Sequence, residues 1–279
     1  MVQRGRESSL IVFVGPTGDH NDRGMQGASI VGHELSRRLD LASSVIGTPQ
    51  PATSDTWHTA LPTALPGLRE LQREHRRIVE RGDIPVAALP RCAASLATLP
   101  TIAEHHPDAL VVWFDAHADL NTPDNTTTGY LGGLVLSAAI GWWDCGLGAG
   151  LRPGNIVLGG TRDLDAPEQA LVDAGTIKLA TGPSLHTALD QHVSDRPVYF
   201  HLDCDVLEPG TVPTDYCVTN GLSLEDLTAV SRRLSQNQIV GIEIAEFEAA
   251  ADPTDDTDYA QPLVGALAPM LATLHTGAP

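Results

Sequence analysis

The stretch ALVVWFDAHAD, residues 109–119, decides the fold of this chain. Its first half is an unbroken apolar run after Pro107, which is typical of a strand buried on both faces of a sheet. If the extended geometry persists beyond that run, Asp115, His117 and Asp119 project to one side, because side chains alternate along a strand. Burying such groups is costly unless something neutralises them. The stretch therefore predicts a strand whose carboxyl end delivers ligands to a cluster of divalent metal ions.

A second stretch, PVYFHLDCD at residues 197–205, repeats this pattern and places Asp203 and Asp205 after another apolar run. Carboxylate oxygens with one imidazole suit Mn²⁺ or a similar octahedral ion better than a zinc–thiolate site. Five ligands are too many for one ion with an open position. They suit two ions ~3.5–4 Å apart, which can hold a hydroxide that attacks an sp² carbon. The alternative is a set of exposed loop acids at two strand ends.

The rest of the chain alternates between apolar runs and amphipathic segments. We expect further strands at 10–14, 45–47, 84–89, 155–160, 176–180 and 238–247. We expect helices at 27–41, 68–81, 93–103 (interrupted near Pro100), 134–140, 167–174, 184–193, from Ser223 onward, and at 263–274. Residues 49–66, 121–133 and 252–258 are expected to be irregular. This alternation predicts one α/β domain over residues 1–279, a three-layer α/β/α sandwich with a mostly parallel central sheet.

Composition narrows the class of partner. The formal charge of −18 argues against nucleic acid or an anionic membrane and favours a small cationic substrate. No stretch approaches the ~20 apolar residues of a membrane span. The four cysteines show neither disulfide-framework nor zinc-finger spacing, so we expect reduced thiols and a cytoplasmic protein.

Four segments carry a resemblance to a known family: WFDAHADLNT (113–122), GGTRDLD (159–165), HLDCDVLEP (201–209) and IAEF (244–247). In this order they resemble motifs of the arginase/agmatinase (ureohydrolase) family, and the likeness extends over nearly the whole chain. The resemblance implies a manganese hydrolase that acts on C–N bonds of linear amidines, with an arginine-like amino acid as substrate. Family members often form trimers or hexamers; for this chain the oligomeric state stays open, and a monomer is possible.

The resemblance also implies roles for individual residues. Asp115 and Asp203 would bridge two Mn²⁺ ions, Asp119 would complete the first site, and His117 and Asp205 the second. Asp119 and Glu246 would act in catalysis, with Glu246 pairing with the guanidinium-type group of the substrate. The amino-acid end of the substrate would be held by Asn121, Thr126, Thr128, Asp163, Asp165 and Glu168.

Two departures from the family pattern affect function. The first metal motif of the family reads Gly-Gly-Asp-His-Ser, whereas this chain has LPRCA at 89–93, which puts Cys92 at the position of the ligand histidine. A helix N-terminus beside Arg91 is expected to lower the pKa of that thiol, and the thiolate would then be a ligand. Because sulfur matches hard Mn²⁺ poorly, the first metal is expected to be held weakly. The alternative is that Cys92 is simply a small buried residue.

The second departure is Gly132, which aligns with a histidine that shuttles protons in arginases. Losing positioned proton transfer costs ~10²–10⁴-fold, so arginine should be hydrolysed slowly. A hydroxyguanidine is less basic, so its hydrolysis would be slowed less by the missing histidine. The chain thus resembles the branch of the family that converts Nω-hydroxy-L-arginine to hydroxyurea and L-ornithine in D-cycloserine (antibiotic) biosynthesis. The alternatives are an arginase, an agmatinase, another guanidino or formimino hydrolase, or a non-catalytic homologue.

Overall fold

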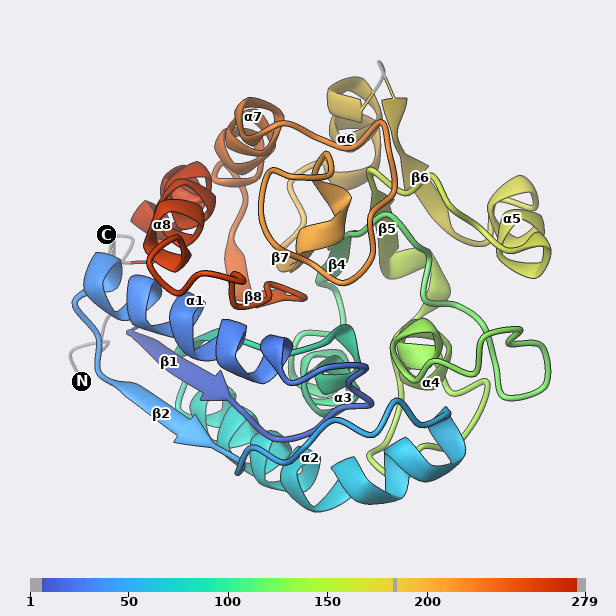
Figure 1. Ribbon diagram of the computed structural model, residues 1–279. Helices are drawn as coiled ribbons and strands as arrows, with labels where there is room; N and C mark the ends of the chain where they lie inside the picture. The colour runs from blue at the N-terminus through green and yellow to red at the C-terminus, as the bar shows by residue number, and fades with distance from the viewer. Residues whose placement is uncertain (1–6, 183–184, 275–279) are drawn as a thin grey trace.

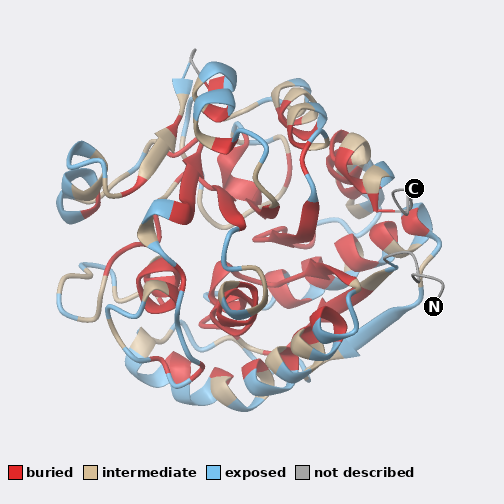
Figure 2. Ribbon diagram, turned by 180° about the vertical axis from the view of Figure 1, so that it is seen from behind, coloured by how far each residue is buried: buried red, intermediate tan, exposed pale blue. Residues whose placement is uncertain are grey.

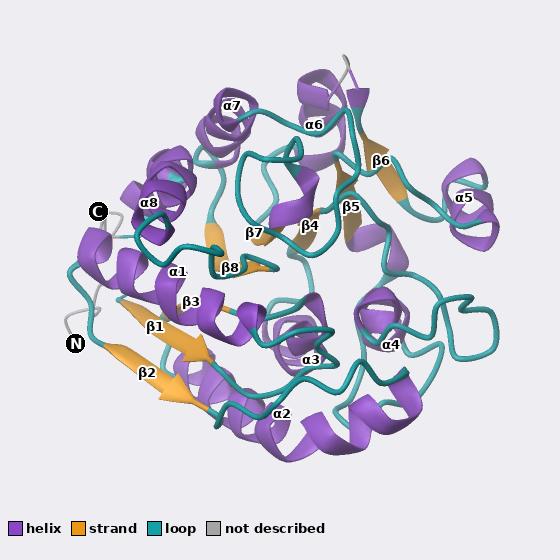
Figure 3. Ribbon diagram, viewed as in Figure 1, coloured by secondary structure: helices purple, strands orange, loops and turns teal. Residues whose placement is uncertain are grey.

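A computed structural model of the protein, described for residues 7–182 and 185–274, contains one parallel eight-stranded sheet (Figures 1 and 3). The strand order is β2-β1-β3-β8-β7-β4-β5-β6, and all pairings are parallel. The bounds are β1 Ser8–Phe13, β2 Ser43–Ile46, β3 Ile84–Ala88, β4 Leu110–Phe114, β5 Ile156–Gly159, β6 Lys178–Ala180, β7 Val198–Asp203 and β8 Ile239–Ala245. The α/β sandwich with a parallel sheet is therefore confirmed.

Helices cover both faces of the sheet (Figure 1). One face carries α1 (Arg23–Leu39), α6 (Leu185–Val193), α7 (Leu224–Leu234), α8 (Asp256–Ala266) and α9 (Ala268–Thr273). The other carries α2 (Trp57–Glu80), α3 (Ser95–His105) and α4 (Val135–Ile140), with α5 (Ala166–Asp173) beside the β6 edge. Each face has its own apolar core, and Figure 2 shows the central strands between them as buried and the edge strand β2 as largely exposed.

The central strands have the two-sided burial that their apolar runs predict. In β4, Val112 and Phe114 pack into one core, and Val111 and Trp113 pack into the other. Every residue of β4 and β7 is buried. Because neither strand has a solvent face, each can be apolar throughout and still end in polar residues at the carboxyl edge of the sheet.

A glycine sets how closely α1 approaches that edge. A Cβ atom on Gly27 would overlap the carbonyl oxygen of Phe247, which follows β8. One turn earlier, a Cβ on Gly24 would lie 2.8 Å from Nε of Arg91, in the segment after β3. The start of α1 can therefore pack directly on the two segments that follow β8 and β3.

Two helices continue through prolines at which the sequence predicts a loop or a break. α2 begins at Trp57, within the segment 49–66 that we expected to be irregular, and it contains Pro62 and Pro66. Both prolines lie on the exposed side of the helix, where the carbonyls that lose a partner can face water. The buried stripe from Ala60 to Leu71 continues past them, so tertiary packing outweighs the local penalty. α3 likewise continues through Pro100 without the predicted interruption.

The C-terminal helical region also differs from its prediction. In place of one helix over 263–274, α8 begins at Asp256 and ends at Ala266, and α9 begins at Ala268. The expected acidic loop 252–258 therefore ends in a helical first turn, where carboxylates are favourable. Pro269 lacks an N–H and is tolerated in the first turn of a new helix, which accounts for the division. Residue 184, the predicted start of α6, lies outside the described residues.

Among the helices of residues 7–182 and 185–274, none combines the length and apolar character that crossing a membrane requires.

Candidate functional site

The site is built at the carboxyl ends of four strands that are neighbours in the sheet, β3, β8, β7 and β4. Cys92 starts a 3-10 turn (Cys92–Ala94) after β3, and Glu246 follows β8. Asp203 is the last residue of β7, and Asp115 follows β4. Residues more than 150 positions apart in sequence thus meet at one edge, as expected for an open parallel sheet.

The acids do not converge by strand alternation, which corrects the geometric argument from the sequence. β4 ends at Phe114, and residues 115–119 form a loop in which Asp119 has a positive φ of 52°. The Asp115 carboxylate accepts the backbone N–H of His117 at 2.6 Å, and Asp203 accepts that of Asp205 at 2.7 Å. The same aspartate turn therefore follows both strands and folds each motif back over the sheet edge.

One group of potential metal ligands comprises Asp115, His117 and Asp205, whose donor atoms all lie within 4.8 Å of one another. The Nδ1 atom of His117 is 3.0 Å from Oδ2 of Asp205 and 3.4 Å from Oδ1 of Asp115. Burial alone would lower the pKa of His117, but hydrogen bonds to the two carboxylates outweigh it and raise that pKa to about 12. The imidazole thus lies in a strongly negative environment, which would also stabilise a bound metal cation.

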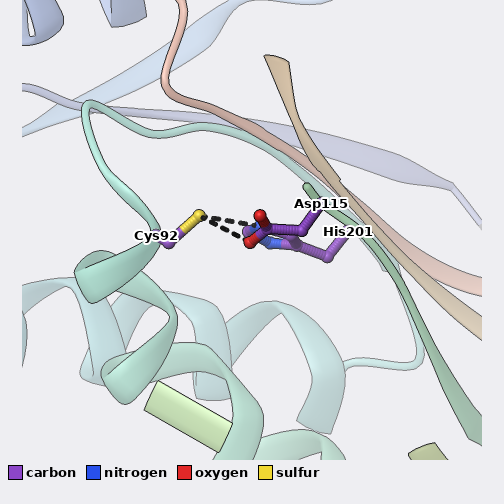
Figure 4. Close-up of side chains that lie close together, drawn as sticks. All are labelled: Cys92, Asp115 and His201. Carbon is purple, nitrogen blue, oxygen red and sulfur yellow. Dashed lines mark hydrogen bonds between the residues drawn. The ribbon is translucent and has the colours of Figure 1, made fainter. Parts of the chain in front are cut away.

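The second group lies around Cys92 and draws on three further strands. The Sγ atom is 3.1 Å from Oδ2 of Asp203, 3.2 Å from Nε2 of His201 and 3.9 Å from Oδ2 of Asp115. Figure 4 shows the side chains of Asp115 and His201 lying together and pointing toward Cys92, which faces them. Donor atoms of Cys92, Asp203 and Glu246 also lie within 4.8 Å of one another. Two overlapping donor sets thus occupy the place where the first metal was predicted.

The buried carboxylates of this site require a cation to balance their charge. Burial, and next the neighbouring charges of Asp115 or Asp205, raise the pKa of Asp119 and Asp203 well above the usual carboxyl value. The Oδ2 atom of Asp119 is buried without a hydrogen-bond partner in the described part of the chain. Buried carboxylates in contact with one another are stable as anions only with a positive partner. Several oxygen donors with imidazole therefore fit a pair of divalent ions of the manganese type.

The expected activation of Cys92 is wrong. Burial, followed by the charges of Asp203 and Asp115, raises the pKa of the Cys92 thiol well above its usual value. The Arg91 guanidinium does not offset this, because it turns to other carboxylates. Without a cation Cys92 is a neutral thiol, as its surroundings are acidic rather than basic.

Sequence reasoning missed the role of Arg91, which is fully buried beside the site. Its guanidinium forms ion pairs with Asp19 at 3.1 Å, Glu246 at 2.9 Å and Glu248 at 2.7 Å. Burial raises the pKa of Glu246 to about 7, although Arg91 and the backbone N–H of Cys92 oppose that shift. A lone arginine between the apolar residues of 84–99 was the available signal, because a buried charge requires partners.

A cavity of ≈ 220 Å³ opens beside the acids. Its lining residues are His117, Asp119, Asn121, Thr128, Tyr130, Gly133, Asp163, Asp165, Glu168 and Tyr216. Most of the residues expected at the amino-acid end of the substrate are thus brought together here. Thr126 is absent from this lining, and its hydroxyl instead accepts the backbone N–H of Gly129 at 3.0 Å. The two tyrosines were not anticipated, and nothing local in the sequence distinguishes them.

Two of the expected substrate contacts also have structural roles. Glu168 accepts the backbone N–H groups of Leu120 at 3.0 Å and Asp165 at 2.9 Å, so both of its oxygens are engaged. The amide of Asn121 donates to Asp165 at 2.7 Å. These contacts tie the loop after β4 to the start of α5 and fix the wall of the cavity.

Comparisons with known proteins give a consistent result. Residues 35–266 match the model of the arginase family. An N(omega)-hydroxy-L-arginine amidinohydrolase from Streptomyces lavendulae is 41% identical over 244 residues, covering 87% of this chain and 89% of that protein. An arginase from Bacillus caldovelox is 26% identical and covers 68% and 70%. Among solved structures, an arginase from Bacillus subtilis superposes with a TM-score of 0.82 at 22% identity, covering 95% of this chain and 98% of that one.

Proposed function

This chain belongs to the arginase family and is therefore a hydrolase of C–N bonds in linear amidines, and we propose that it converts Nω-hydroxy-L-arginine to hydroxyurea and L-ornithine. The similarity to the Streptomyces lavendulae enzyme supports this substrate. A place in antibiotic biosynthesis would follow from the same likeness.

The proposed cofactor is the binuclear manganese centre of the arginase family. Asp115 and Asp203 would bridge the two ions, with Asp119 and Cys92 completing the first site and His117 and Asp205 the second. The donor atoms of these residues other than Asp119 fall into clusters, and the uncompensated acid charge, to which Asp119 contributes, also supports this assignment. When bound, the two ions supply Lewis acidity and an activated water. A thiol donor beside hard oxygens makes the first site the weaker of the two.

The Arg91–Glu246 ion pair is the observation that carries the choice of substrate. Glu246 is the residue proposed to pair with the guanidine-type group, but one of its oxygens already contacts the Arg91 guanidinium at 2.9 Å. Its other oxygen accepts the backbone N–H of Cys92 at 2.9 Å. Because both oxygens of Glu246 already have partners, a second full cation would gain little from it, whereas a weakly basic hydroxyguanidine can bind uncharged. The site therefore favours hydroxy-arginine over arginine and agmatine.

The groups available for proton transfer also favour a substrate that is easier to deprotonate than arginine. A Cβ atom on Gly132 would overlap the ring of Tyr130, so the space of the family's histidine side chain is filled. The Tyr130 hydroxyl lies 3.3 Å from Glu246, to which it donates. Asp119 lines the cavity beside the proposed metal site, and its carboxylate would pass a proton to the departing amine of ornithine. Asp119 and Glu246 are thus the proposed catalytic residues.

The far end of the cavity supports an amino-acid substrate rather than a decarboxylated amine. Asn121 and Thr128 supply polar groups for an α-carboxylate, and Asp163 and Asp165 supply anionic groups for an α-ammonium. Glu168 would contribute indirectly, by holding Asp165 and the loop after β4 in place. A substrate without the α-carboxylate, such as agmatine, would leave part of this lining unused.

Product analysis tests the proposal. With Mn²⁺, purified protein should release hydroxyurea and ornithine from hydroxy-arginine, and urea from arginine at a kcat/KM ~10²–10⁴-fold lower. Agmatine should be the poorest of the three. Faster turnover of arginine or agmatine, or no hydroxyurea at all, would reject hydroxy-arginine as the substrate and leave one of the family alternatives.

A further inference from the structure

We propose that His201, from the middle of the sheet, supplies the imidazole ligand of the first metal site through its Nε2 atom. This inference rests on the metal centre of the proposed function and assigns it a ligand from β7. In the sequence, His201 could equally be a partner behind the ligands or an ordinary buried histidine. Three observations favour a ligand.

The position of Nε2 is the first observation. His201 is fully buried, and Nε2 lies 3.2 Å from Sγ of Cys92. The donor atoms of Cys92, Asp115 and His201 all lie within 4.8 Å of one another. Donors that share one ion, with bonds of about 2.0–2.6 Å, lie no more than roughly 4–5 Å apart. As Figure 4 shows, the imidazole and the thiol approach the same point from opposite sides.

The orientation of the ring is the second observation. Nδ1 of His201 lies 2.8 Å from Oε1 of Glu243, which is also fully buried. Glu243 is itself anchored, since it accepts hydrogen bonds from Ser95 at 2.6 Å, Thr98 at 2.9 Å and Tyr199 at 2.7 Å. A neutral imidazole that donates Nδ1–H to a carboxylate presents the lone pair of Nε2. This carboxylate–histidine arrangement is the usual support behind a metal-bound imidazole.

The third observation is the rigidity of the ring. The indole of Trp113 stacks on His201 with centroids 3.4 Å apart and planes 3° from parallel. The same indole donates its N–H to Oδ2 of Asp115 at 3.0 Å. One side chain therefore fixes two of the converging donors, His201 and Asp115. Such support keeps ligands at their binding geometry before the ion arrives.

The chemistry explains why an imidazole is needed here. The thiol at Cys92 suits manganese poorly, whereas imidazole is a good borderline ligand. Cys92 occupies the position of the ligand histidine in the motif after β3. His201 brings an imidazole to the same point from β7, two strands away in the sheet order β3-β8-β7. The thiol then lies beside the ion without having to be its principal donor.

The test compares metal stoichiometry in matched variants. His201→Asn keeps an N–H near Nδ1 for Glu243 but removes Nε2, and Cys92→Ala removes the thiol. Free Mn²⁺ is measured by electron paramagnetic resonance during titration of each protein, and circular dichroism confirms folding without metal. His75→Asn serves as a control, because His75 is a buried histidine that contacts Tyr199 and none of the acids of the site.

The wild type and His75→Asn are expected to bind two ions. His201→Asn should lose first-site affinity by more than about 100-fold, beyond what a lost supporting residue costs. Cys92→Ala should keep both sites, with the first weakened far less than in His201→Asn, and Cys92→His should restore the first site in the His201→Asn background. Two tight ions in His201→Asn, with one lost in Cys92→Ala, would overturn the proposal and make Cys92 the ligand.

A measurement on the unmodified chain covers the case in which His201→Asn fails to fold. In protein loaded with Co²⁺, a ligated His201 should give a paramagnetically shifted Nδ1–H signal that exchanges slowly, because Glu243 buries it. Two bound cobalt ions without that signal would overturn the proposal. Metal binding as expected with no hydrolysis of hydroxy-arginine would reject the substrate but leave His201 as a ligand, so the two failures are distinguishable.

Discussion

Replacing Arg91 with methionine should destabilise the protein by about 3–5 kcal/mol, the usual cost of removing one partner from a buried ion pair. The guanidinium is fully buried and lies 2.7–3.1 Å from three carboxylates, those of Asp19, Glu246 and Glu248. Methionine replaces the aliphatic part of the arginine side chain but leaves these anions without their shared cation. Against a typical total stability of ~5–15 kcal/mol, the loss is large enough to measure and small enough for the variant to fold.

The pH dependence of this loss follows from the remaining partners. Glu248 keeps an ion pair with Arg23 at 2.5 Å, while Asp19 and Glu246 lose their only cationic ion-pair partner among the described residues. Burial raises the pKa of both carboxyls even with Arg91 present, and removal of Arg91 should raise these pKa values further. A carboxyl whose pKa is higher in the folded than in the unfolded state contributes stability at pH values below its unfolded-state pKa. That contribution is lost as the pH rises through the folded-state pKa. The deficit of the variant should therefore grow from pH 5 to pH 8.

Urea unfolding of metal-free protein at both pH values measures the effect. The matched control is Arg23→Met, which removes a half-exposed partner of Glu248 and should cost no more than ~1 kcal/mol. If Arg91→Met lies within 1 kcal/mol of the wild type, or if its deficit shrinks as pH rises, then Arg91 does not neutralise the buried acids. The electrostatic argument for an uncharged substrate would fail with it.

Four further substitutions have defined outcomes. Asp115→Asn and Asp203→Asn should each abolish turnover, measured as ornithine release, and retained activity in either would contradict a shared metal centre. Burial lowers the pKa of His75 from 6.5 to about 4, so its neutral form should contribute ~3 kcal/mol above pH 6.5 that is lost as pH falls toward 4; unfolding of His75→Asn should lack that decline. Gly27→Ala should cost ~1–3 kcal/mol in thermal unfolding, since its Cβ would overlap the Phe247 carbonyl, and an unchanged melting temperature would refute the close approach.

The sequence was sufficient for the sheet and for most of the acids, because these signals are local. An apolar run of five or six residues followed by aspartates identifies both a buried strand and the edge it reaches, as for β4 and β7. The exact path of the acids was not predictable from alternation. Asp115 and Asp203 each form a turn with the backbone two residues later, and that turn competes with continued strand geometry.

Arg91 shows a different limit of sequence reasoning. Its partners Asp19 and Glu246 lie 72 and 155 positions away, and no spacing rule connects residues so distant. A buried charge can be suspected from its apolar neighbours, but its partner depends on which strands are adjacent. Similarly, the start of α2 depends on an apolar stripe that packs on β1 and β3, while its prolines signal a loop locally.

The order of the sheet suggests why the two unusual residues after β3 occur together. Arg91 contacts Glu246 at the end of β8, the strand next to β3, and Cys92 contacts His201 on β7, one strand further. Each substitution therefore finds its complement on a neighbouring strand rather than nearby in sequence. If Arg91 sets the charge of the bound guanidine and His201 restores the imidazole, reverting Cys92 alone should tighten metal binding without restoring a preference for arginine. A gain in arginine turnover from Cys92→His alone would show that the two changes are not separable in this way.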